Sequence, residues 1–494
     1  MAVRGDSILV ADGLYYESVT TTLDSVLIGS MFDIDNDSLH IENTIIDGNT
    51  MSRAFNVMSE SVTISGITIQ NTYASSKGAG VYFAGDIISI QNCKFINNAT
   101  TLGPNNYGGA IYLNSTSSAD ILNCYFEDNE AREGGAIAFD GSIGTVRNCH
   151  FYLNNSFYRN DDIMLIDEET DVVIENCLFE GSPNGSIREQ FGSDFQIYNS
   201  TFINCTAGIR AQSGDIVIDR TSFINCGTIE DNYSHAFYTG HGTIQVSNTI
   251  FKDNQAENGA CIEIESSAKV TIEHCQFFNN YASNYGGAIY GDIADTLIIN
   301  SSTFWNNTNE WDAYGNALSL SGGVKLIKNT IMFDRHDMES TFGYEFYYSL
   351  NFNSFQGEGF SADTLFVDAN SGDFNLRWRS PAIDAGDPTF ALDPDGTRSD
   401  IGALYFNQLD TIPPMVELNY PEITQPVMNG DVLLISWSAS DNLELTWAKL
   451  FFTSDGGESF ILSDSVDAIL GEIEWIAPDV VSWGCNLAIW VSDL

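Results

Sequence analysis

Two adjacent carboxylates and an imidazole come nearest to a catalytic set in this sequence. Asp161 and Asp162 lie in the tripeptide NDD (160–162), and His241 lies in GHG (240–242). Hydrolysis of a glycosidic bond needs a pair of carboxyl groups at a defined separation, one of which protonates the leaving group. Because 80 positions separate Asp161 from His241 (241 − 161), we favour the plainer interpretation that all three are polar residues of surface turns.

Three further carboxylates lie in the polar segment DPDGTRSD (393–400). Asp393, Asp395 and Asp400 supply the oxygen ligands that calcium prefers, so calcium is the one cofactor that the sequence suggests. However, the glycine does not take the position it has in an EF-hand loop, Pro-Asp-Gly is a common turn former, and Arg398 could pair with the carboxylates instead. A calcium site and a plain turn are therefore both open.

Three tyrosines, Tyr82, Tyr112 and Tyr290, each follow an apolar β-branched residue within a short alternating segment. Alternation sends the apolar residue to one face of a strand and the tyrosine to the other, so we expect the tyrosines to face outward. Outward rings can stack on sugars, which makes these three residues candidates for ligand binding. The alternative, which we favour, is an ordinary sheet surface.

The overall charge excludes two classes of partner. The 494 residues include 19 Lys and Arg against 67 Asp and Glu, a formal net charge of −48. Such a surface repels the phosphates of nucleic acids and the headgroups of anionic membranes. No segment approaches the ~18 consecutive apolar residues of a membrane helix. Nine cysteines are an odd number, so at least one thiol has no partner within the chain.

A repeat must position all these groups. NCKFINN (92–98), NCYFEDN (123–129) and HCQFFNN (274–280) share a cysteine, a phenylalanine and a final asparagine. A period near 26 residues is typical of a solenoid, whose units bury their apolar faces only against their neighbours. The phenylalanines of the repeat recur at intervals of 21 to 31 residues, at Phe95, Phe126, Phe151, Phe179, Phe202, Phe223, Phe251, Phe277 and Phe304.

The segments between the glycine and asparagine positions are β-branched or aromatic and alternate, with hardly any helical spacing. We therefore predict an all-β solenoid of about twelve stacked coils with parallel strands. Within one unit, alternation sends Cys93 and Phe95 inward and Lys94 outward. The column at the cysteine position reads Cys, Ser or Thr, which suits a narrow interior, and a disulfide ladder is the alternative.

Asparagines and paired glycines mark the corners of each unit. Asparagine tolerates left-handed backbone angles, and asparagine amides that stack from coil to coil can bond to each other, so we expect both roles after each phenylalanine. The pairs Gly108-Gly109, Gly134-Gly135 and Gly286-Gly287 predict a second tight corner before the next strand.

FxxN, as at Phe95–Asn98, is paired with GGAI (108–111, 134–137, 286–289). This pairing resembles the repeat of polymorphic outer membrane proteins and, more broadly, the right-handed parallel β-helix proteins of the pectin-lyase-like superfamily. GDSILVADGLYYE (5–17) and the segment 380–406 are similar to the first coil and the closing segment of secreted bacterial members. NDD and GHG also resemble polygalacturonase motifs, but those lie about one coil apart, against about three here. The resemblance implies a right-handed β-helix and leaves the activity open, because lyases, hydrolases, adhesins and inert stalks share this fold.

After DTIPP (410–414) the repeat stops and longer alternating strands begin, as in VLLISWSAS (432–440). Their spacing, the hairpin signal SDGG and the residues Trp437 and Trp475 favour an Ig-like or fibronectin-type sandwich, similar to modules that follow β-helices in secreted bacterial proteins. We expect the natural polypeptide to extend beyond both ends. The predicted domains are a β-helix over 1–340, its closing segment over 341–410 and a sandwich over 411–494.

Two functions fit this fold. The first is a non-catalytic, secreted or cell-surface monomer that acts in adhesion or carbohydrate binding, with a polysaccharide or cell-surface glycan as its partner. The second is a polysaccharide lyase or glycoside hydrolase that acts on an extracellular polysaccharide. The first is favoured because the repeat uses nearly all its distinctive residues for stacking and catalytic groups are few.

Overall fold

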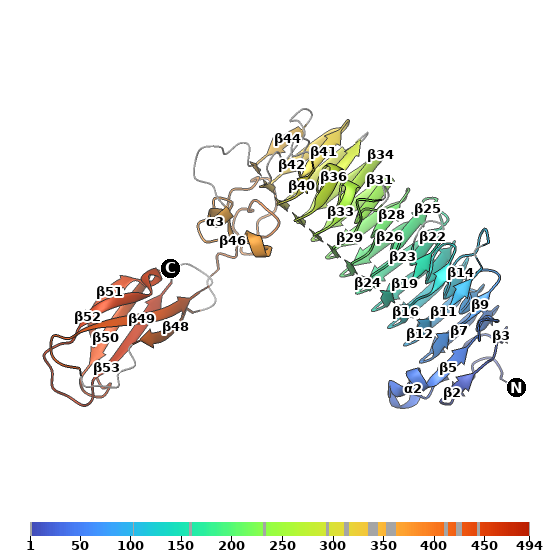
Figure 1. Cartoon of the computed structure of the whole chain (residues 1–494), viewed down its shortest axis with the longest axis horizontal. Coiled ribbons are helices and arrows are strands. Elements are labelled where there is room, and N and C mark those ends of the chain that lie inside the picture. The colour runs from blue at the N-terminus through green and yellow to red at the C-terminus, as the bar shows by residue number, and fades with distance from the viewer. Residues whose placement is uncertain are drawn as a thin grey trace.

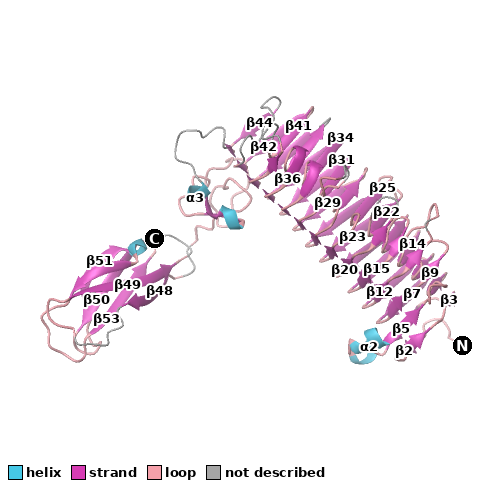
Figure 2. Cartoon of the chain, viewed as in Figure 1, coloured by secondary structure: helices cyan, strands magenta, loops and turns pink. Residues whose placement is uncertain are grey.

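The chain folds into a parallel β-solenoid followed by three small antiparallel sheets, as the computed structural model shows (Figure 1). The structure describes residues 2–493 apart from residue 102 and segments 158–160, 231–233, 293–295, 311–315, 334–343, 352–361, 410–412, 421–426 and 442–444. Strands dominate the described chain, and helices are confined to short segments (Figure 2). These are α1 (Phe32–Asp35), α2 (Leu39–Asn43), α3 (Ala362–Leu365) and the 3₁₀ helices η2 (Ala369–Ser371) and η3 (Ala468–Leu470).

One sheet takes a single strand from each coil, and its 14 strands all pair in parallel. The predicted all-β parallel solenoid is therefore confirmed. The strands are β2 (Gly13–Tyr15), β5 (Thr44–Asp47), β8 (Thr68–Gln70), β12 (Lys94–Ile96), β16 (Tyr125–Glu127), β20 (His150–Tyr152), β24 (Leu178–Glu180), β27 (Thr201–Ile203), β30 (Ser222–Ile224), β32 (Ile250–Lys252), β35 (Gln276–Phe278), β39 (Thr303–Trp305), β43 (Ile331–Met332) and β45 (Leu350–Asn351).

A second sheet of 24 strands takes up to two strands from each coil and forms the opposite wall. Its strands are β1 (Ser7–Val10), β3 (Val19–Thr21), β4 (Val26–Ser30), β6 (Phe55–Val57), β7 (Ser61–Ser65), β10 (Val81–Phe83), β11 (Ile87–Gln91), β14 (Ile111–Asn114), β15 (Ser118–Leu122), β18 (Ile137–Asp140), β19 (Ile143–Arg147), β22 (Ile163–Ile166), β23 (Asp171–Glu175), β25 (Ile187–Gln190), β26 (Asp194–Tyr198), β28 (Ile209–Ala211), β29 (Ile216–Asp219), β31 (Phe237–Ser247), β34 (Ile262–Glu273), β37 (Ile289–Asp292), β38 (Thr296–Asn300), β41 (Leu318–Ser321), β42 (Val324–Lys328) and β44 (Tyr344–Tyr347). Short strands complete the coils in two small sheets: β9 (Tyr73–Ala74), β13 (Ala99–Thr100), β17 (Glu130–Ala131) and β21 (Asn155–Ser156), and β33 (Gln255–Asn258), β36 (Tyr281–Tyr285) and β40 (Thr308–Asn309).

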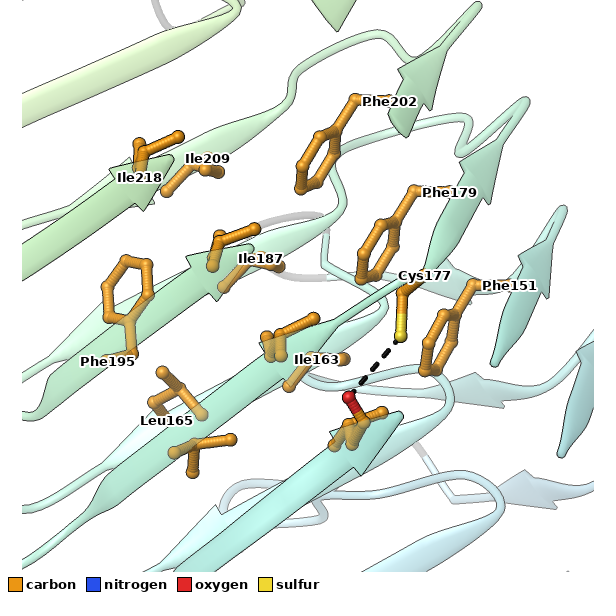
Figure 3. Packing of buried hydrophobic residues seen from close by; sticks show 14 of the residues in the cluster. Phe151, Ile163, Leu165, Cys177, Phe179, Ile187, Phe195, Phe202, Ile209 and Ile218 are labelled. Carbon is orange, nitrogen blue, oxygen red and sulfur yellow. Dashed lines mark hydrogen bonds between the residues drawn. The ribbon is translucent and has the colours of Figure 1, made fainter. Parts of the chain in front are cut away.

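The phenylalanines of the repeat form one continuous interior row. Phe95 pairs in register with Phe126, and Phe126 with Phe151. Consecutive rings from Phe95 to Phe304 stack with centroids 4.5–5.0 Å apart and planes within 9° of each other. Figure 3 shows part of this row beside the inward isoleucines of the facing sheet. The prediction that equivalent side chains pile up from coil to coil is confirmed.

The cysteines are interior residues and not cross-links. All nine thiols are free, and every cysteine except Cys485 is buried. The thiol of Cys177 donates to the carbonyls of Glu175, at 3.3 Å, and of Val146 in the preceding coil, at 3.5 Å. Figure 3 draws one hydrogen bond of this thiol as a dashed line. The disulfide ladder is therefore wrong, and the same backbone carbonyls explain why Ser and Thr replace Cys in this column, because hydroxyls make the same bond.

The asparagines of the corner divide into the two predicted roles. Asn97, like other residues at its position, has a left-handed backbone, with φ of 53°. Its neighbour Asn98 is buried, and its amide donates to Asn129 Oδ1 at 2.9 Å. Asn129 in turn donates to Asn154 Oδ1 at 2.8 Å, so the amides form a ladder inside the solenoid. The second predicted corner is also confirmed, since Gly108 has φ of 67° and a Cβ atom at Gly109 would lie 2.1 Å from a backbone oxygen.

Beyond the last coils, the chain from residue 362 to residue 406 packs on the outer face of the 14-stranded sheet. Leu365 and Phe374 share a core with Phe278 and Ile331 of that sheet. The backbone N–H of Ala403 donates to Thr303 Oγ1 at 3.0 Å. This segment contains the antiparallel pair β46 (Phe366–Asp368) and β47 (Asp373–Leu376).

The C-terminal region forms two three-stranded antiparallel sheets, β48-β49-β52 and β51-β50-β53. Trp437 and Trp475 of the first sheet pack with Ala448 and Leu450 of the second, so both tryptophans are core residues, as predicted. The Ig-type assignment of these sheets stays a prediction. The boundaries predicted at 340/341 and 410/411 lie outside the described residues. The strands are β48 (Met415–Tyr420), β49 (Val432–Ser440), β50 (Trp447–Thr453), β51 (Ile461–Asp467), β52 (Glu472–Ile476) and β53 (Asn486–Ser492).

Candidate functional site

Asp161 and Asp162 take the positions of Gly135 and Ala136 at the corner before β22. The N–H groups of Gly135 and Ala136 donate to the carbonyls of Asp161 and Asp162, at 2.8 and 2.9 Å, so the two corners are stacked. Both aspartates are buried, with 1% and 0% of their surface exposed. The prediction that they are surface turn residues is therefore half right, since they form a turn but lie beneath the surface.

Neighbouring groups of the corner bond to both carboxyls. Asp161 accepts from the N–H of Gly134 at 2.7 Å and from Ser156 Oγ at 3.1 Å, and burial raises its pKa to about 7. Asp162 accepts from Ser182 Oγ, and burial raises the pKa of Asp162 well above its ordinary value. Two carboxyls that are covered and bonded in this way have no surface on which to meet a polymer.

His241 does not join these aspartates. It is exposed on β31, and the pairings β22–β25, β25–β28 and β28–β31 place three coil steps between it and the strand that follows Asp162. The two residues also differ in their position along the coil. Asp162 lies just before β22, whereas His241 is the fifth residue of β31. The sequence-based estimate of about three coils is confirmed, and the three residues do not form one site. Asn160 of the NDD motif lies outside the described residues.

Backbone N–H groups donate hydrogen bonds to the three candidate carboxylates of the segment 393–400. Asp393 Oδ2 accepts from the N–H of Asp400 at 2.9 Å, and Asp395 Oδ2 accepts from the N–H of Gln408 at 2.8 Å. The two oxygens of Asp400 accept from the N–H groups of Asp384 and Phe406 at 2.7 and 2.6 Å, and burial raises the pKa of Asp400 to about 6.

Calcium therefore has no preformed ligand set in the segment 393–400. Among the residues that the structure describes, no three His, Cys, Asp or Glu side chains come together as metal ligands. Arg398 does not pair with the aspartates through a bond that the structure shows; it donates to the carbonyls of Gly386, at 2.6 Å, and Ala385. The geometry is that of a hydrogen-bonded turn.

The three tyrosines do not form one exposed stripe. Tyr82 and Tyr112 pair in register and stack at 5.6 Å, but Tyr112 is fully buried, so the expectation of an exposed ring at this position is corrected. The row then continues through the non-aromatic residues Ala138, Met164, Arg188 and Arg210 before Tyr238, Glu263 and Tyr290. Tyr290 stacks instead on Tyr285, at 6.1 Å.

Partly exposed aromatic rings gather on the outer face of the 14-stranded sheet, away from the three predicted tyrosines. Tyr125 and His150 are register partners with ring centroids 5.2 Å apart, and His150 lies 6.2 Å from Tyr152. His150 Nε2 also pairs with Glu180 Oε2 at 3.1 Å. Burial, together with Glu127, raises the pKa of Tyr125 to about 12. The sequence pattern that predicts these outward rings is the alternation about the inward phenylalanines, because the residues on either side of each phenylalanine must face outward.

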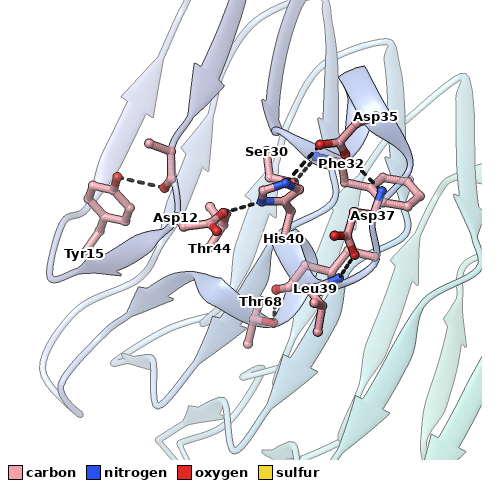
Figure 4. Close-up of polar contacts among 12 residues, drawn as sticks. Asp12, Tyr15, Ser30, Phe32, Asp35, Asp37, Leu39, His40, Thr44 and Thr68 are labelled. Carbon is pink, nitrogen blue, oxygen red and sulfur yellow. Dashed lines mark hydrogen bonds and ion pairs between the residues drawn. The ribbon is translucent and has the colours of Figure 1, made fainter.

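A polar cluster joins the first coil to the helices α1 and α2 (Figure 4). His40 of α2 contacts Asp12 Oδ1 through Nδ1, at 2.6 Å, and Asp35 Oδ2 of α1 through Nε2, at 3.1 Å. The bond to Asp12 raises the pKa of His40 above its ordinary value, and the backbone N–H of Asp37 lowers the pKa of Asp35. These two contacts of His40, one to each carboxylate, hold the helical insertion against the solenoid.

Comparisons with known proteins give distant relatives from Dictyostelium discoideum. Metabotropic glutamate receptor-like protein R is 23% identical over 321 residues, which cover 62% of this chain and 18% of that protein. A transmembrane domain-containing protein is 25% identical over 411 residues, 75% of this chain and 23% of that protein. Metabotropic glutamate receptor-like protein P is 22% identical over 356 residues, 63% of this chain and 24% of that protein. The chain thus spans about a fifth to a quarter of the length of these relatives.

No solved structure matches the chain. No helix within the described ranges is long and apolar enough to span a bilayer. The model of the right handed beta helix region matches residues 21–157, 53–209 and 153–290, so the matches together cover 270 of the 494 residues (290 − 21 + 1). Most of the parallel strands, the phenylalanines from Phe95 to Phe277 and the amides from Asn98 to Asn154 lie within this stretch. The chain therefore belongs to the family of right-handed β-helix proteins.

Proposed function

We propose that this chain is a non-catalytic β-helix module of a secreted or cell-surface protein, and that it binds carbohydrate in adhesion. The patch of Tyr125, His150 and Tyr152 on the 14-stranded sheet is the observation that carries this proposal. Aromatic rings on a flat sheet offer apolar faces to sugar C–H groups, and the carboxylates of Glu127 and Glu180 beside them can accept bonds from sugar hydroxyls. A neutral glycan fits best, because the net charge of −48 disfavours an acidic polymer.

The positions of the candidate acids support binding over catalysis. Asp161 and Asp162 are buried and bonded to their own corner, and His241 lies three coil steps away on the solvent side. An inverting or retaining hydrolase needs two carboxyl groups that both reach the scissile bond.

The names of the relatives support a place at the cell surface. Two relatives are called receptor-like and one transmembrane domain-containing, and this chain matches only part of each. In this proposal the solenoid is an extracellular part of a longer protein, and the C-terminal sheets form an Ig-like spacer. The Dictyostelium relatives make a eukaryotic cell surface as good a setting as the bacterial one that the sequence resemblance suggests.

A glycan array probed with the intact chain tests the proposal. We expect binding to neutral glycans, and we expect Tyr125→Ala or Tyr152→Ala to weaken it by about 1 kcal/mol for each ring, roughly fivefold. Tyr198→Ala is the matched control, because Tyr198 is a partly exposed tyrosine on the other large sheet. Equal binding by Tyr125→Ala and the unaltered chain would refute the role of the patch. Release of reducing ends or unsaturated products from any polysaccharide would refute the non-catalytic function.

A further inference from the structure

A lysine side chain lies in a cage of tyrosine rings on the outer face of the 24-stranded sheet. Lys77 Nζ is 4.3 Å from the ring centroid of Tyr112 and 5.3 Å from that of Tyr107. The ammonium also donates to Tyr112 Oη and pairs with Asp140 Oδ2 at 3.2 Å. Two ring faces, a phenol oxygen and a carboxylate are the combination that proteins use to bind ammonium groups. We call Tyr107, Tyr112 and Asp140 the ammonium cage.

Arg53 holds the backbone that carries the lysine. Its guanidinium donates to the carbonyls of Lys77 and Gly78, both at 2.7 Å, and lies 5.0 Å above the ring of Tyr82. The N–H of Gly78 also donates to the next coil, at the carbonyl of Tyr107, at 3.0 Å. The loop backbone is thus tied down at both sides, and only the lysine side chain is left to move.

The side chain of Lys77 separates the ammonium cage from solvent. It is 29% exposed, whereas Tyr112 is fully buried. A rotation about the side-chain bonds of Lys77 would uncover the face of Tyr112 and leave Asp140 without its cation. Such rotamer changes of partly exposed side chains need no movement of the backbone.

We propose that the ammonium cage is a binding site for a lysine side chain of a partner protein, and that Lys77 occupies it in the free chain. The ligand chemistry follows from the present occupant, a primary ammonium on a flexible alkyl stem. A sugar amine has no such stem and would bring its ring against the rim where the stem of Lys77 now lies. The net charge of −48 attracts basic partners to the surface. This site is on another sheet from the aromatic patch, and its test does not depend on carbohydrate binding.

Lys77 is tethered beside the ammonium cage, so its own amine competes with any amine that binds from solution. A resident amine acts at an effective concentration in the millimolar range or above, so a free amine competes poorly with Lys77 in the unaltered chain. Lys77→Ala removes the competitor and leaves the rings and Asp140 in place. We expect this variant to bind Nα-acetyl-lysine methylamide at least about tenfold more tightly than the unaltered chain does. Ligand-observed NMR on the full chain measures both dissociation constants.

Matched variants and probes identify the site. Lys77→Ala/Asp140→Asn and Lys77→Ala/Tyr107→Ala should lose the gain, and Lys269→Ala, which removes an exposed lysine from β34, should show none. The Nε-acetylated form of the same probe should not bind to Lys77→Ala, because it has no charge. A circular dichroism spectrum that matches the β-spectrum of the unaltered chain establishes that each variant is folded.

Three results would overturn the proposal. One is a folded Lys77→Ala variant with no gain in binding the lysine probe. Another is a gain that survives in the Asp140→Asn double variant or extends equally to the acetylated probe. The third is binding of glucosamine in preference to the lysine probe, which would mean that the ammonium cage serves an amino sugar.

Discussion

Glu189 is a carboxylate that points into the solenoid, and its removal should destabilise the fold strongly. It follows Ile187 by two residues on β25, in register with the inward Leu165, and is fully buried. Its Oε1 accepts from the N–H groups of Gly192 and Ser193, at 2.7 and 3.0 Å. Its Oε2 accepts from those of Gln212 and Ser213 in the next coil, at 2.7 and 2.8 Å. One side chain thereby closes the corners of two consecutive coils.

Glu189→Gln keeps the shape of the side chain and turns one acceptor into a donor. An amide can still accept from one pair of N–H groups, but its NH₂ group then faces the other pair, which lie inside the protein without an acceptor. Each buried N–H without a partner costs about 1–3 kcal/mol, so the two together reduce the free energy of unfolding by about 2–6 kcal/mol. Glu189→Leu restores the apolar side chain of the preceding coil but leaves four N–H groups unpaired, so its loss should be larger.

Urea denaturation followed by circular dichroism measures these losses as changes in the midpoint. Glu168→Gln is the control, because Glu168 is exposed in the preceding coil and its change should stay within about 0.5 kcal/mol. A Glu189→Gln variant that is as stable as this control would show that water or a rearranged corner satisfies the amides. A Glu189→Leu variant more stable than Glu189→Gln would refute the hydrogen-bond account and favour simple packing.

Three further predictions follow from the solenoid interior. Asn129→Ala should reduce stability by about 3–6 kcal/mol, because Asn129 bonds to Asn98, Asn154 and the carbonyl of Phe95 within the buried ladder, and urea denaturation checks this loss. Asp161 has a folded-state pKa of about 7 against 3.8 for the free group. Its contribution to the free energy of unfolding is therefore complete below pH 3.8 and is lost as the pH rises through 7. Asp161→Asn should remove this pH dependence, on the order of 4 kcal/mol, and unfolding titrations between pH 4 and 8 measure it. A thiol reagent should label Cys485 alone in the folded chain and all nine cysteines in urea, and rapid labelling of a second thiol before unfolding would contradict the buried column.

The interior of the solenoid follows from the sequence because every coil repeats one environment. Alternation about Phe95 decides which side chains face inward, and stacking then places Phe126 and Phe151 over the same point. The asparagine roles follow for a similar reason, since a corner needs one left-handed residue and one amide that satisfies the next coil. Neither inference depends on how far apart the units lie in the chain.

The outer face is not predictable in this way, because the loops between the repeated strands differ from coil to coil. Tyr82 and Tyr112 share a position in the repeat, yet only Tyr112 is fully covered, because Lys77 and its loop lie over the ring. Asp161 and Asp162 look like surface acids in the sequence and are buried, because their corner stacks between two others.

The sequence by itself determined the all-β solenoid, its spacing near 26 residues, the phenylalanine row and the asparagine ladder, since each depends on local alternation and on translation from one coil to the next. The tertiary structure alone decided which outward aromatics are accessible, where Glu189 finds four amide donors, and that Asp161 and Asp162 are buried. Those outcomes depend on contacts between loops of unequal length. Such contacts do not repeat from coil to coil, so no periodic pattern in the sequence predicts them.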